Sequence, residues 1–262
     1  MKFRPCIDIH NGKVKQLVGG SLKDEGDRAT ENFVAENGGA YFAEMYKRDG
    51  LKGGHIIILN HKGSEYYEAT KKQALEALKE YPQGMQIGGG IDADNAEDFI
   101  VAGASHVIVT SYVFKDGKVN MENLQKLVEA VGREKIVLDL SCRKKENKFF
   151  VVTDRWQKFT NMELNQTTLD ELSKYCDEFL IHGVDVEGKG SGMDEELVKI
   201  LSAWKQKNPE ANDITYAGGI ASFEDIRKFA EYCDESLDFT IGSALDVFGG
   251  TLSYKEVVKY YR

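Results

Sequence analysis

The chain has few of the residues that would divide it or cross-link it. Only 3 prolines occur among 262 residues, and no stretch rich in proline, glycine or serine separates two parts. We therefore expect a single domain over residues 1–262. The 4 cysteines include no C-x-x-C pair and no spacing typical of a metal site, so reduced and mostly buried thiols are the better interpretation. A small domain held together by disulfides is excluded.

Long apolar runs and a basic charge balance are also missing. No apolar run approaches the roughly 20 residues that cross a membrane, and the first residues already look like a strand, which leaves no room for a signal peptide. The net charge is −9, and a nucleic acid or an anionic membrane needs a basic surface. We expect a cytoplasmic monomer that binds neither. A phosphorylated small molecule remains compatible, because backbone N–H groups and helix N-termini bind phosphate whatever the net charge.

A repeat runs through what the chain does contain. In each half, an apolar run ends in an acid, a Gly-Gly turn follows, and a later apolar run ends in a serine. A fixed spacing of this kind indicates an internal duplication. Three residue pairs show nearly the same spacing: Asp8 and Asp139 (131 residues apart), Gly90 and Gly219 (129), and Ser111 and Ser243 (132).

Strand-like and helix-like segments alternate along the chain. Near-continuous hydrophobic strands indicate a parallel sheet covered on its faces, and eight such units in this length favour a (β/α)8 barrel built from two half-barrels. An open doubly wound sheet is the alternative, but it gives no reason for two similar halves. Expected strands, beyond the first at 3–10, include 55–59, 106–109, 135–140, 178–183, 213–217 and 237–241. Helical patterns occur at about 39–48, 66–80, 94–102, 120–131, 168–176, 194–206, 222–232 and 253–261.

Four turns are candidate phosphate sites. In such barrels phosphate usually binds after strands seven and eight, which here means Gly218–Gly219 and Gly242–Ser243. Gly89–Gly90 and Thr110–Ser111 are their counterparts in the first half. A lone Gly-Gly pair is more often an ordinary strand-to-helix turn, but matched pairs favour two cradles of bare N–H groups. We predict a ligand with a phosphate at each end.

Asp8 and Asp139 are the candidate proton-transfer groups. Each ends an apolar strand, and the repeat places them opposite each other across the barrel mouth. Partial desolvation raises the pKa of a carboxylate and suits it to proton transfer. The alternative is that either one only caps a turn or pairs with a lysine, which is less attractive for a matched pair.

Five segments together resemble a known family. Residues 6–14, 86–91, 137–143, 216–220 and 241–244 read CIDIHNGKV, QIGGGI, VLDLSCR, YAGGI and IGSA. In this order and spacing they resemble the phosphoribosylformimino-aminoimidazole-carboxamide ribotide isomerases of histidine biosynthesis. The resemblance covers almost the whole chain, and segments 139–144 and 185–188 are most similar to the eukaryotic form.

The resemblance implies an activity and assigns roles. The family performs an Amadori rearrangement of an aminoaldose to an aminoketose, on a substrate with a phosphate at each end, without a metal or redox cofactor. An acid protonates the ribose ring oxygen and opens the ring, and a base then removes the C2 proton. The first-strand motif assigns the base to Asp8. Aligning the loop on Gly188 and Gly192 makes Glu187 the first choice for the acid and Asp185 the second. Asp139 then positions the substrate or assists proton transfer.

Two more side chains are candidates for substrate contact, and three histidines are not. Trp156 corresponds to a loop tryptophan that stacks on the aminoimidazole ring, with ordinary loop packing as the alternative. Arg143 is either a contact to a phosphate or the carboxamide, or a surface charge. His10, His106 and His182 are interpreted as core or rim histidines with satisfied partners.

Three other functions stay open. The related cyclase subunit shares the half-barrels but usually carries a lysine on its first strand, which residues 5–8 lack. A dual isomerase that also serves tryptophan synthesis would share this barrel. A non-catalytic phosphometabolite-binding barrel is the third, kept open by the unusual loop around Glu187. Retention of Asp8 and Asp139 argues against it.

Overall fold

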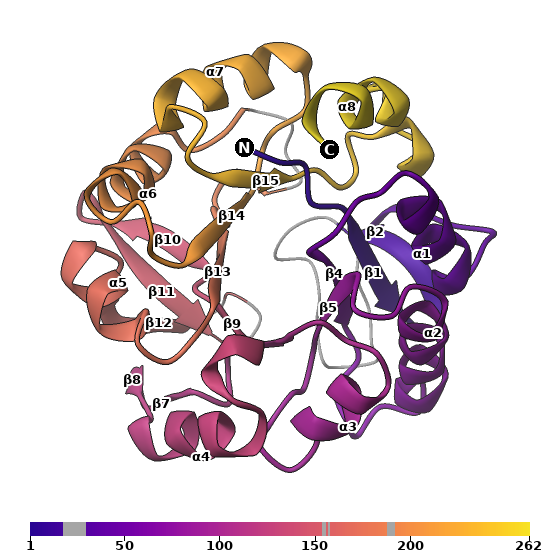
Figure 1. The fold of residues 1–262 in the computed structure, drawn as a ribbon, viewed down its shortest axis with the longest axis horizontal. Helices are drawn as coiled ribbons and strands as arrows, with labels where there is room; N and C mark the ends of the chain where they lie inside the picture. The colour runs from indigo at the N-terminus through magenta and orange to yellow at the C-terminus, as the bar shows by residue number, and fades with distance from the viewer. Residues whose placement is uncertain (18–29, 154–155, 157, 188–191) are drawn as a thin grey trace.

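Eight parallel strands form the centre of the fold (Figure 1). The computed structural model describes residues 1–17, 30–153, 156, 158–187 and 192–262, so Gly188, which anchored the loop alignment, lies outside the described residues. The main sheet has the strand order β15-β14-β13-β9-β6-β5-β4-β1-β2-β3. Its parallel strands are β1 (Cys6–His10), β4 (Gly54–Ile58), β5 (Met85–Gly88), β6 (Val107–Val109), β9 (Ile136–Asp139), β13 (Glu178–His182), β14 (Asp213–Ala217) and β15 (Asp238–Thr240).

Residues just before β1 close this sheet into a barrel. Phe3 bridges Phe239 of β15 in parallel orientation. The Arg4 N–H donates to the Phe239 carbonyl at 2.8 Å, and the Phe239 N–H donates to the Lys2 carbonyl at 3.0 Å. The first and last strands are therefore neighbours, which confirms the predicted (β/α)8 barrel.

Helices surround the barrel (Figure 1) because each carries an apolar stripe on the side that faces the strands. In α7, for example, Ile226, Phe229 and Cys233 are buried, and the Ser222 side chain caps the helix by accepting the Asp225 N–H at 3.1 Å. The helices in the described residues are α1 (Gly39–Arg48), α2 (Tyr67–Glu80), α3 (Ala96–Val101), α4 (Met121–Val131), α5 (Gln166–Leu172), α6 (Glu195–Lys207), α7 (Phe223–Cys233) and α8 (Tyr254–Tyr261), with 3-10 turns η2 (Arg133–Lys135) and η3 (Asp246–Phe248).

One helix begins and ends earlier than the sequence indicated. The pattern predicted 168–176, whereas α5 spans Gln166–Leu172. The Asn165 side chain accepts the Thr168 N–H at 3.0 Å and starts the helix early. The chain turns again at its end, where the Tyr175 N–H donates to the Leu172 carbonyl at 3.0 Å.

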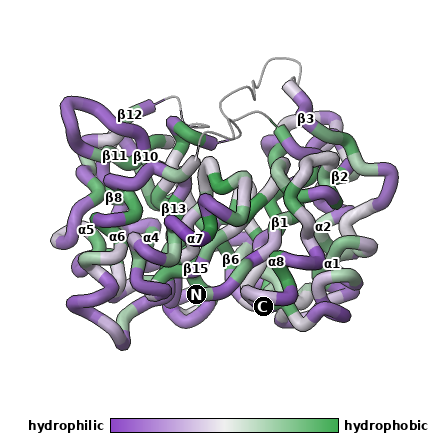
Figure 2. The backbone as a smooth tube through the Cα atoms, turned by 90° about the horizontal axis from the view of Figure 1, so that it is seen from above, coloured by the Kyte–Doolittle hydropathy of each residue, from purple (hydrophilic) through white to green (hydrophobic). Residues whose placement is uncertain are grey.

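Antiparallel strands that the sequence did not predict extend one end of the barrel. Both halves insert such strands after their first strand, following β1 and β9, and the short pair β7–β8 follows β6. Figure 2 shows β3 and β10–β12 at the end opposite the two termini. These strands are β2 (Lys13–Leu17), β3 (Glu31–Val34), β7 (Phe114–Lys115), β8 (Lys118–Val119), β10 (Cys142–Lys145), β11 (Lys148–Thr153) and β12 (Lys158–Glu163).

An apolar layer fills the middle of the barrel. Side chains alternate between the two faces of a strand, so Asp139 and His182 point to the same inward face as the residues two positions before them, Val137 and Leu180. They therefore lie above the apolar layer, at the mouth. The layer consists of Ile57, Ile108, Val137, Leu180 and Ala217.

Candidate active site

Two glycine turns follow β5 and β14, and both have positive φ values at their two glycines. Gly89 and Gly218 have φ values of 101° and 134°, and Gly90 and Gly219 have φ values of 69° and 74°. L side chains rarely adopt such angles. A Cβ at Gly89 would in addition collide with the carbonyl oxygen of Ile58. The duplication read from the sequence therefore reappears as matched backbone geometry in which bare N–H groups can approach an anion.

The turns after β6 and β15 are matched as well. The Thr110 carbonyl accepts the Val113 N–H at 3.1 Å, and the Gly242 carbonyl accepts the Leu245 N–H at 3.0 Å. Each turn presents a serine next, at positions 111 and 243. All four predicted cradle turns thus follow barrel strands at the mouth, two in each half.

Asp139, at the end of β9, is a firmly anchored carboxylate. Its Oδ1 accepts the Ser141 N–H at 2.9 Å and the Ser141 hydroxyl at 2.8 Å, and lies 3.4 Å from His182 Nδ1. Burial alone would raise the pKa of Asp139, but the charge of His182 and the bonds from His182 and Ser141 outweigh it and hold that pKa below its usual value. Asp139 is therefore ionised at neutral pH.

The pKa of Asp8, in the middle of β1, is shifted in the opposite direction. Burial, followed by the negative charge of Glu187, raises the pKa of Asp8 to about 7, while His182 and a 3.5 Å contact from Gln16 Nε2 oppose the rise. A carboxylate with a pKa near neutrality is a stronger base than an exposed aspartate and can still ionise. Asp8 and Asp139 are therefore equivalent in the repeat but differ in acidity.

Glu187 is the third acid at this end of the barrel. Burial raises its pKa, and His182 opposes the rise. The negative charge of Glu187 also acts on Asp8. Two buried carboxylates that interact in this way ionise one after the other, so one holds a proton while the other is charged.

Asp185, the alternative acid, is hydrogen-bonded to residues of β10. One carboxylate oxygen accepts Arg143 Nε and the other accepts the Lys144 N–H, both at 2.9 Å. The Arg143 guanidinium also lies over the Phe159 ring, 5.6 Å from its centre. Asp185 and Arg143 therefore join the loop after β13 to β10.

His182, at the end of β13, lies among the acids. Burial lowers its pKa, but Asp139, Glu187 and Asp8 outweigh this effect and raise the pKa to about 9. The neighbouring His55 of β4 behaves oppositely, because burial and the charge of His182 lower its pKa to about 3. At neutral pH the mouth therefore holds a charged His182 beside a neutral His55.

Trp156 lies over this group. Its ring centre is 5.9 Å from that of His182, with 42° between the ring planes, and its φ is 69°. The structure thus brings Trp156 to the predicted carboxylates, where an aromatic face could cover a planar heterocycle.

Sequence reasoning did not include His182, Ser141 or Gln16 in the site. It interpreted His182 as a rim histidine with a satisfied partner, which is correct about the partner but misses that this partner is Asp139. One signal was available. His182 ends a barrel strand, as Asp139 does, and residues at that position point into the mouth.

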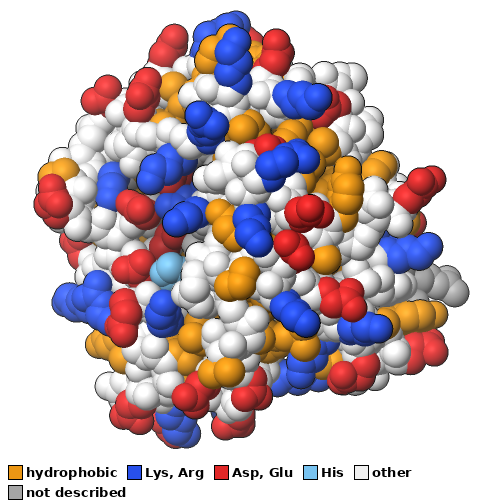
Figure 3. Space-filling model, turned by 45° about the vertical axis from the view of Figure 1, so that its right-hand side comes forward, with side chains coloured by type: hydrophobic (Ala, Val, Ile, Leu, Met, Phe, Trp, Pro, Cys, Tyr) orange, Lys and Arg blue, Asp and Glu red, His pale blue; other side chains and the backbone are white. Residues whose placement is uncertain are grey.

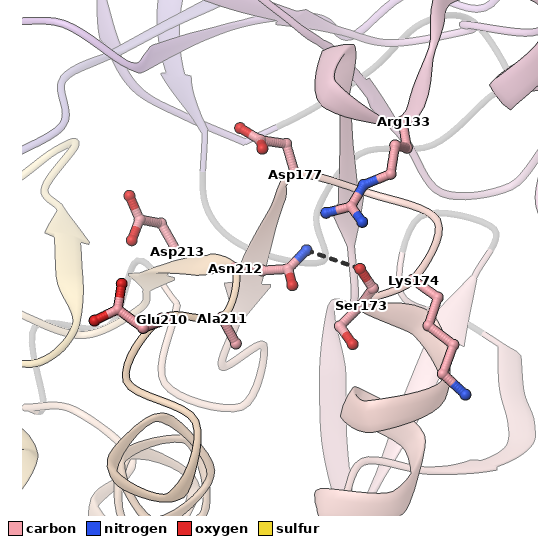
Figure 4. A pocket seen from close by; sticks show the side chains of 8 residues that line it. All are labelled: Arg133, Ser173, Lys174, Asp177, Glu210, Ala211, Asn212 and Asp213. Atoms are coloured by element: carbon pink, nitrogen blue, oxygen red, sulfur yellow. Dashed lines mark hydrogen bonds between the residues drawn. The ribbon is translucent and has the colours of Figure 1, made fainter.

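A second hollow lies at the far end of the barrel and contains none of the predicted site residues (Figure 4). Asp177 and Asp213 place it where β13 and β14 begin. In it the Asn212 side chain donates to the Ser173 carbonyl at 3.2 Å. Its lining of mixed charge consists of Arg133, Ser173, Lys174, Asp177, Glu210, Ala211, Asn212 and Asp213.

The described residues include no cluster of three or more His, Cys, Asp or Glu side chains placed to hold a metal ion. Within the same residues, no helix is both long and apolar enough to cross a membrane. The four cysteines are free and buried.

A family model described as "Histidine biosynthesis protein" matches residues 2–252. The chain belongs to this family. Its curated members at this similarity share one name, 1-(5-phosphoribosyl)-5-((5-phosphoribosylamino)methylideneamino)imidazole-4-carboxamide isomerase.

Three histidine biosynthesis relatives show how complete the match is. A chloroplastic protein of Medicago truncatula is 50% identical over 100% of this chain and 82% of its own length. A protein of Yarrowia lipolytica is 48% identical over 95% of this chain and 93% of its own. The Saccharomyces cerevisiae protein is 42% identical over 96% and 94%.

Proposed function

We propose that this chain catalyses the reaction for which its relatives are named, the Amadori rearrangement of a ribotide with two phosphoribosyl groups. The chain is an aldose–ketose isomerase of histidine biosynthesis. The observation that carries its mechanism is the pair of electrostatically linked acids, Asp8 and Glu187, at a barrel mouth flanked by two matched sets of glycine turns.

The matched turns bind the two phosphates. One set, at Gly89–Gly90 and Thr110–Ser111, belongs to the first half, and the other, at Gly218–Gly219 and Gly242–Ser243, belongs to the second. A substrate with a phosphate at each end spans the mouth between them. This arrangement holds the sugar over the acids and converts proton transfer into an intramolecular event.

Glu187 protonates the ribose ring oxygen. Burial raises the pKa of Glu187 and so favours its protonated form more than in an exposed glutamate, and the contacts of Asp185, both of whose oxygens accept hydrogen bonds, support Glu187 as the first choice. Ring opening leaves a Schiff base, which draws electrons from C1 and makes the C2 proton acidic.

Asp8 then removes the C2 proton. The resulting enolamine takes up a proton at C1 while its C2 hydroxyl becomes the ketone, so the net change is an isomerisation. Asp139 stays ionised and positions the substrate at this stage, because Ser141 and His182 fix its carboxylate.

Trp156 covers the aminoimidazole ring in this proposal. Its place beside His182 supports the role. Contact of Arg143 with a phosphate or the carboxamide stays a prediction, since the guanidinium is paired with Asp185 in the absence of substrate.

The direct test is an isomerase assay on the purified chain with the histidine-pathway ribotide. We expect turnover that survives exhaustive chelation and needs no added nicotinamide or flavin. Phosphoribosylanthranilate is assayed in parallel, and turnover of that substrate as well would identify a dual isomerase. Absence of turnover with either substrate would favour a non-catalytic phosphometabolite-binding barrel.

The remaining expectations belong to the same proposal. They are a single domain over 1–262, a monomer, a cytoplasmic location and no nucleic-acid partner. On the face drawn in Figure 3, basic and acidic side chains are interspersed, which supports the last of these. One relative carries a chloroplast label, so the location needs its own experiment, for which fluorescence microscopy of a tagged chain is sufficient.

A further inference from the structure

His182 is the side chain around which the acids of the mouth are arranged. Its Nδ1 lies 3.4 Å from Asp139 Oδ1, and 86% and 85% of the two side chains are shielded from solvent. Ser141 holds the same oxygen through two further bonds of 2.9 and 2.8 Å. Trp156 covers the histidine ring from one direction and His55 packs against it at 6.4 Å.

The charges around His182 come from three elements. Asp139 belongs to β9, Asp8 to β1 and Glu187 to the loop after β13, and all three act on the imidazole. Among the described residues, His55 of β4 is a further titratable neighbour, and it is neutral. His182 is therefore the cation that acts on all three acids, although it contacts only Asp139 directly.

We propose that His182 is a positioning residue of the isomerase: it fixes the Asp139 carboxylate at the mouth and supplies the positive charge shared by Asp8, Asp139 and Glu187. The inference rests on the proposed function and adds a residue to it. His182 itself transfers no proton to the substrate. With its charge in place, Asp139 stays ionised and Asp8 loses its proton at a lower pH than it would beside Glu187 alone.

The first test needs no activity. NMR titration of the 5 histidines measures the pKa of His182 in the wild-type chain and in Asp139→Asn. We expect a wild-type pKa well above that of an ordinary histidine, and a clear fall in Asp139→Asn because the partner charge is gone. A His182 that titrates at or below the ordinary value in the wild-type chain would overturn the proposal.

The second test is the pH dependence of kcat/KM in His182→Gln. Glutamine can still donate a hydrogen bond but carries no charge, so the pKa of Asp8 rises and the acid limb of the profile moves to higher pH. The retained donor and the two Ser141 bonds keep the Asp139 carboxylate in place, so the loss of kcat/KM at the pH optimum stays below the roughly 100-fold that a misplacement of an ångström would cost. His55→Gln is the matched control, since it alters packing around the same ring without removing a charge, and its acid limb stays where the wild-type limb is.

These outcomes separate the inference from the proposed function. An inactive wild-type chain with a strongly basic His182 would refute the function and leave the charge arrangement intact. Equal acid-limb shifts in His182→Gln and His55→Gln, or none in either, would show that His182 acts through packing alone and would refute the inference.

Discussion

In the part of the chain that the structure describes, each end of the barrel has a buried cation close to three carboxylates, but only at one end does that cation contact all three. At the end where the strands begin, Arg4 lies 3.1 Å from Glu178, 3.4 Å from Asp213 and 2.7 Å from Asp238. At the mouth, His182 contacts Asp139 at 3.4 Å and acts on Asp8 and Glu187 only through its field. The apolar layer that includes Val137 and Leu180 separates the two groups.

The two ends differ because arginine and histidine have different numbers of hydrogen-bond donors. A guanidinium has five N–H donors in a rigid fork, and an imidazolium has two. At the base, Gln86 and Thr215 donate to Glu178 as well, each at 2.8 Å, so both of its oxygens are bound. Burial still raises the pKa of Glu178 to about 7, although Arg4 and these two bonds oppose it.

Asp8 and Glu178 therefore have similar pKa values but different surroundings. A proton that reaches Glu178 must displace hydrogen bonds inside a closed network, whereas Asp8, with its single 3.5 Å contact from Gln16, lies at the mouth where a substrate can approach. We therefore expect the end where the strands begin to contribute to folding stability, and the mouth to contribute to catalysis. Substitutions at the two ends should change different observables, and the following predictions test this contrast from the largest expected effect to the smallest.

Asp8→Asn should have the largest effect on catalysis and little effect on folding. Asparagine keeps the shape of the side chain but accepts no proton, so we expect kcat to fall by about 10²–10⁴-fold. KM and the melting temperature should stay close to wild type. In the wild-type chain, kcat/KM should fall as the pH drops below about 7, because the base must be ionised and its pKa is about 7. Substantial kcat in the variant would assign the base to another residue.

Arg4→Met should lower folding stability and leave catalysis by the folded molecules largely unchanged. It leaves the buried Glu178 and Asp238 without their cation, while Asp213 keeps Lys205 at 3.5 Å, and breaking a buried ion pair costs about 3–5 kcal/mol of unfolding free energy. Urea unfolding measures the loss, and the molecules that remain folded should keep their KM. Lys47→Met is the control, because the Lys47–Glu80 pair is exposed and worth at most about 1 kcal/mol. Equal losses in the two variants would contradict the contrast between the ends.

Glu187→Gln should lower kcat by about 100-fold or more, as expected for loss of a general acid, and should remove the basic limb of its pH profile. Asp185→Asn should cost much less in kcat, since Asp185 is engaged with Arg143 and the Lys144 N–H. The reverse ranking would make Asp185 the acid. Near-normal turnover in both variants would make Asp139 the leading candidate.

The sequence predicted the barrel because its information is local and repeated. Apolar runs that alternate with helical patterns specify a closed parallel sheet, although β5 (Met85–Gly88) was not among the expected runs. The strands β10 and β12 were missed because they are mostly polar and become strands only by pairing with the apolar β11 (Lys148–Thr153). Antiparallel pairing of this kind depends on neighbours that a local pattern does not show.

In the candidate site, too, some residues could be predicted from the sequence and others could not. Asp8 and Asp139 could be predicted from the repeat, but only Asp139 ends its strand, because β1 continues past Asp8 to His10. The role of His182 depends on the neighbouring strand, since β13 and β9 pair with Leu180 opposite Asp139, and this register is set by the closed barrel. The distinct pKa values of Asp8 and Asp139 likewise come from their neighbours, Glu187 for one and His182 with Ser141 for the other.

The smallest predicted effects lie in the glycine turns, where the two halves should differ. Both Gly90 and Gly219 have positive φ, so alanine at either adds backbone strain of about 1 kcal/mol. At Gly219 the new Cβ would also collide with the Gly192 carbonyl, whereas at Gly90 the nearest atom is Cε of Lys62 at 3.7 Å. Gly219→Ala should therefore lower both stability and substrate affinity, and Gly90→Ala should raise KM modestly with a nearly unchanged melting temperature.

Anion binding completes that comparison. Crystals of the wild-type chain soaked in sulfate should show an anion at both glycine turns, since each presents bare N–H groups at glycines with positive φ. Gly219→Ala should lose the anion of the second half and keep the other, because the two sites lie on different strands. An anion in the second half alone, together with a normal KM for Gly90→Ala, would mean that the first turn retains the geometry of the duplication without binding phosphate.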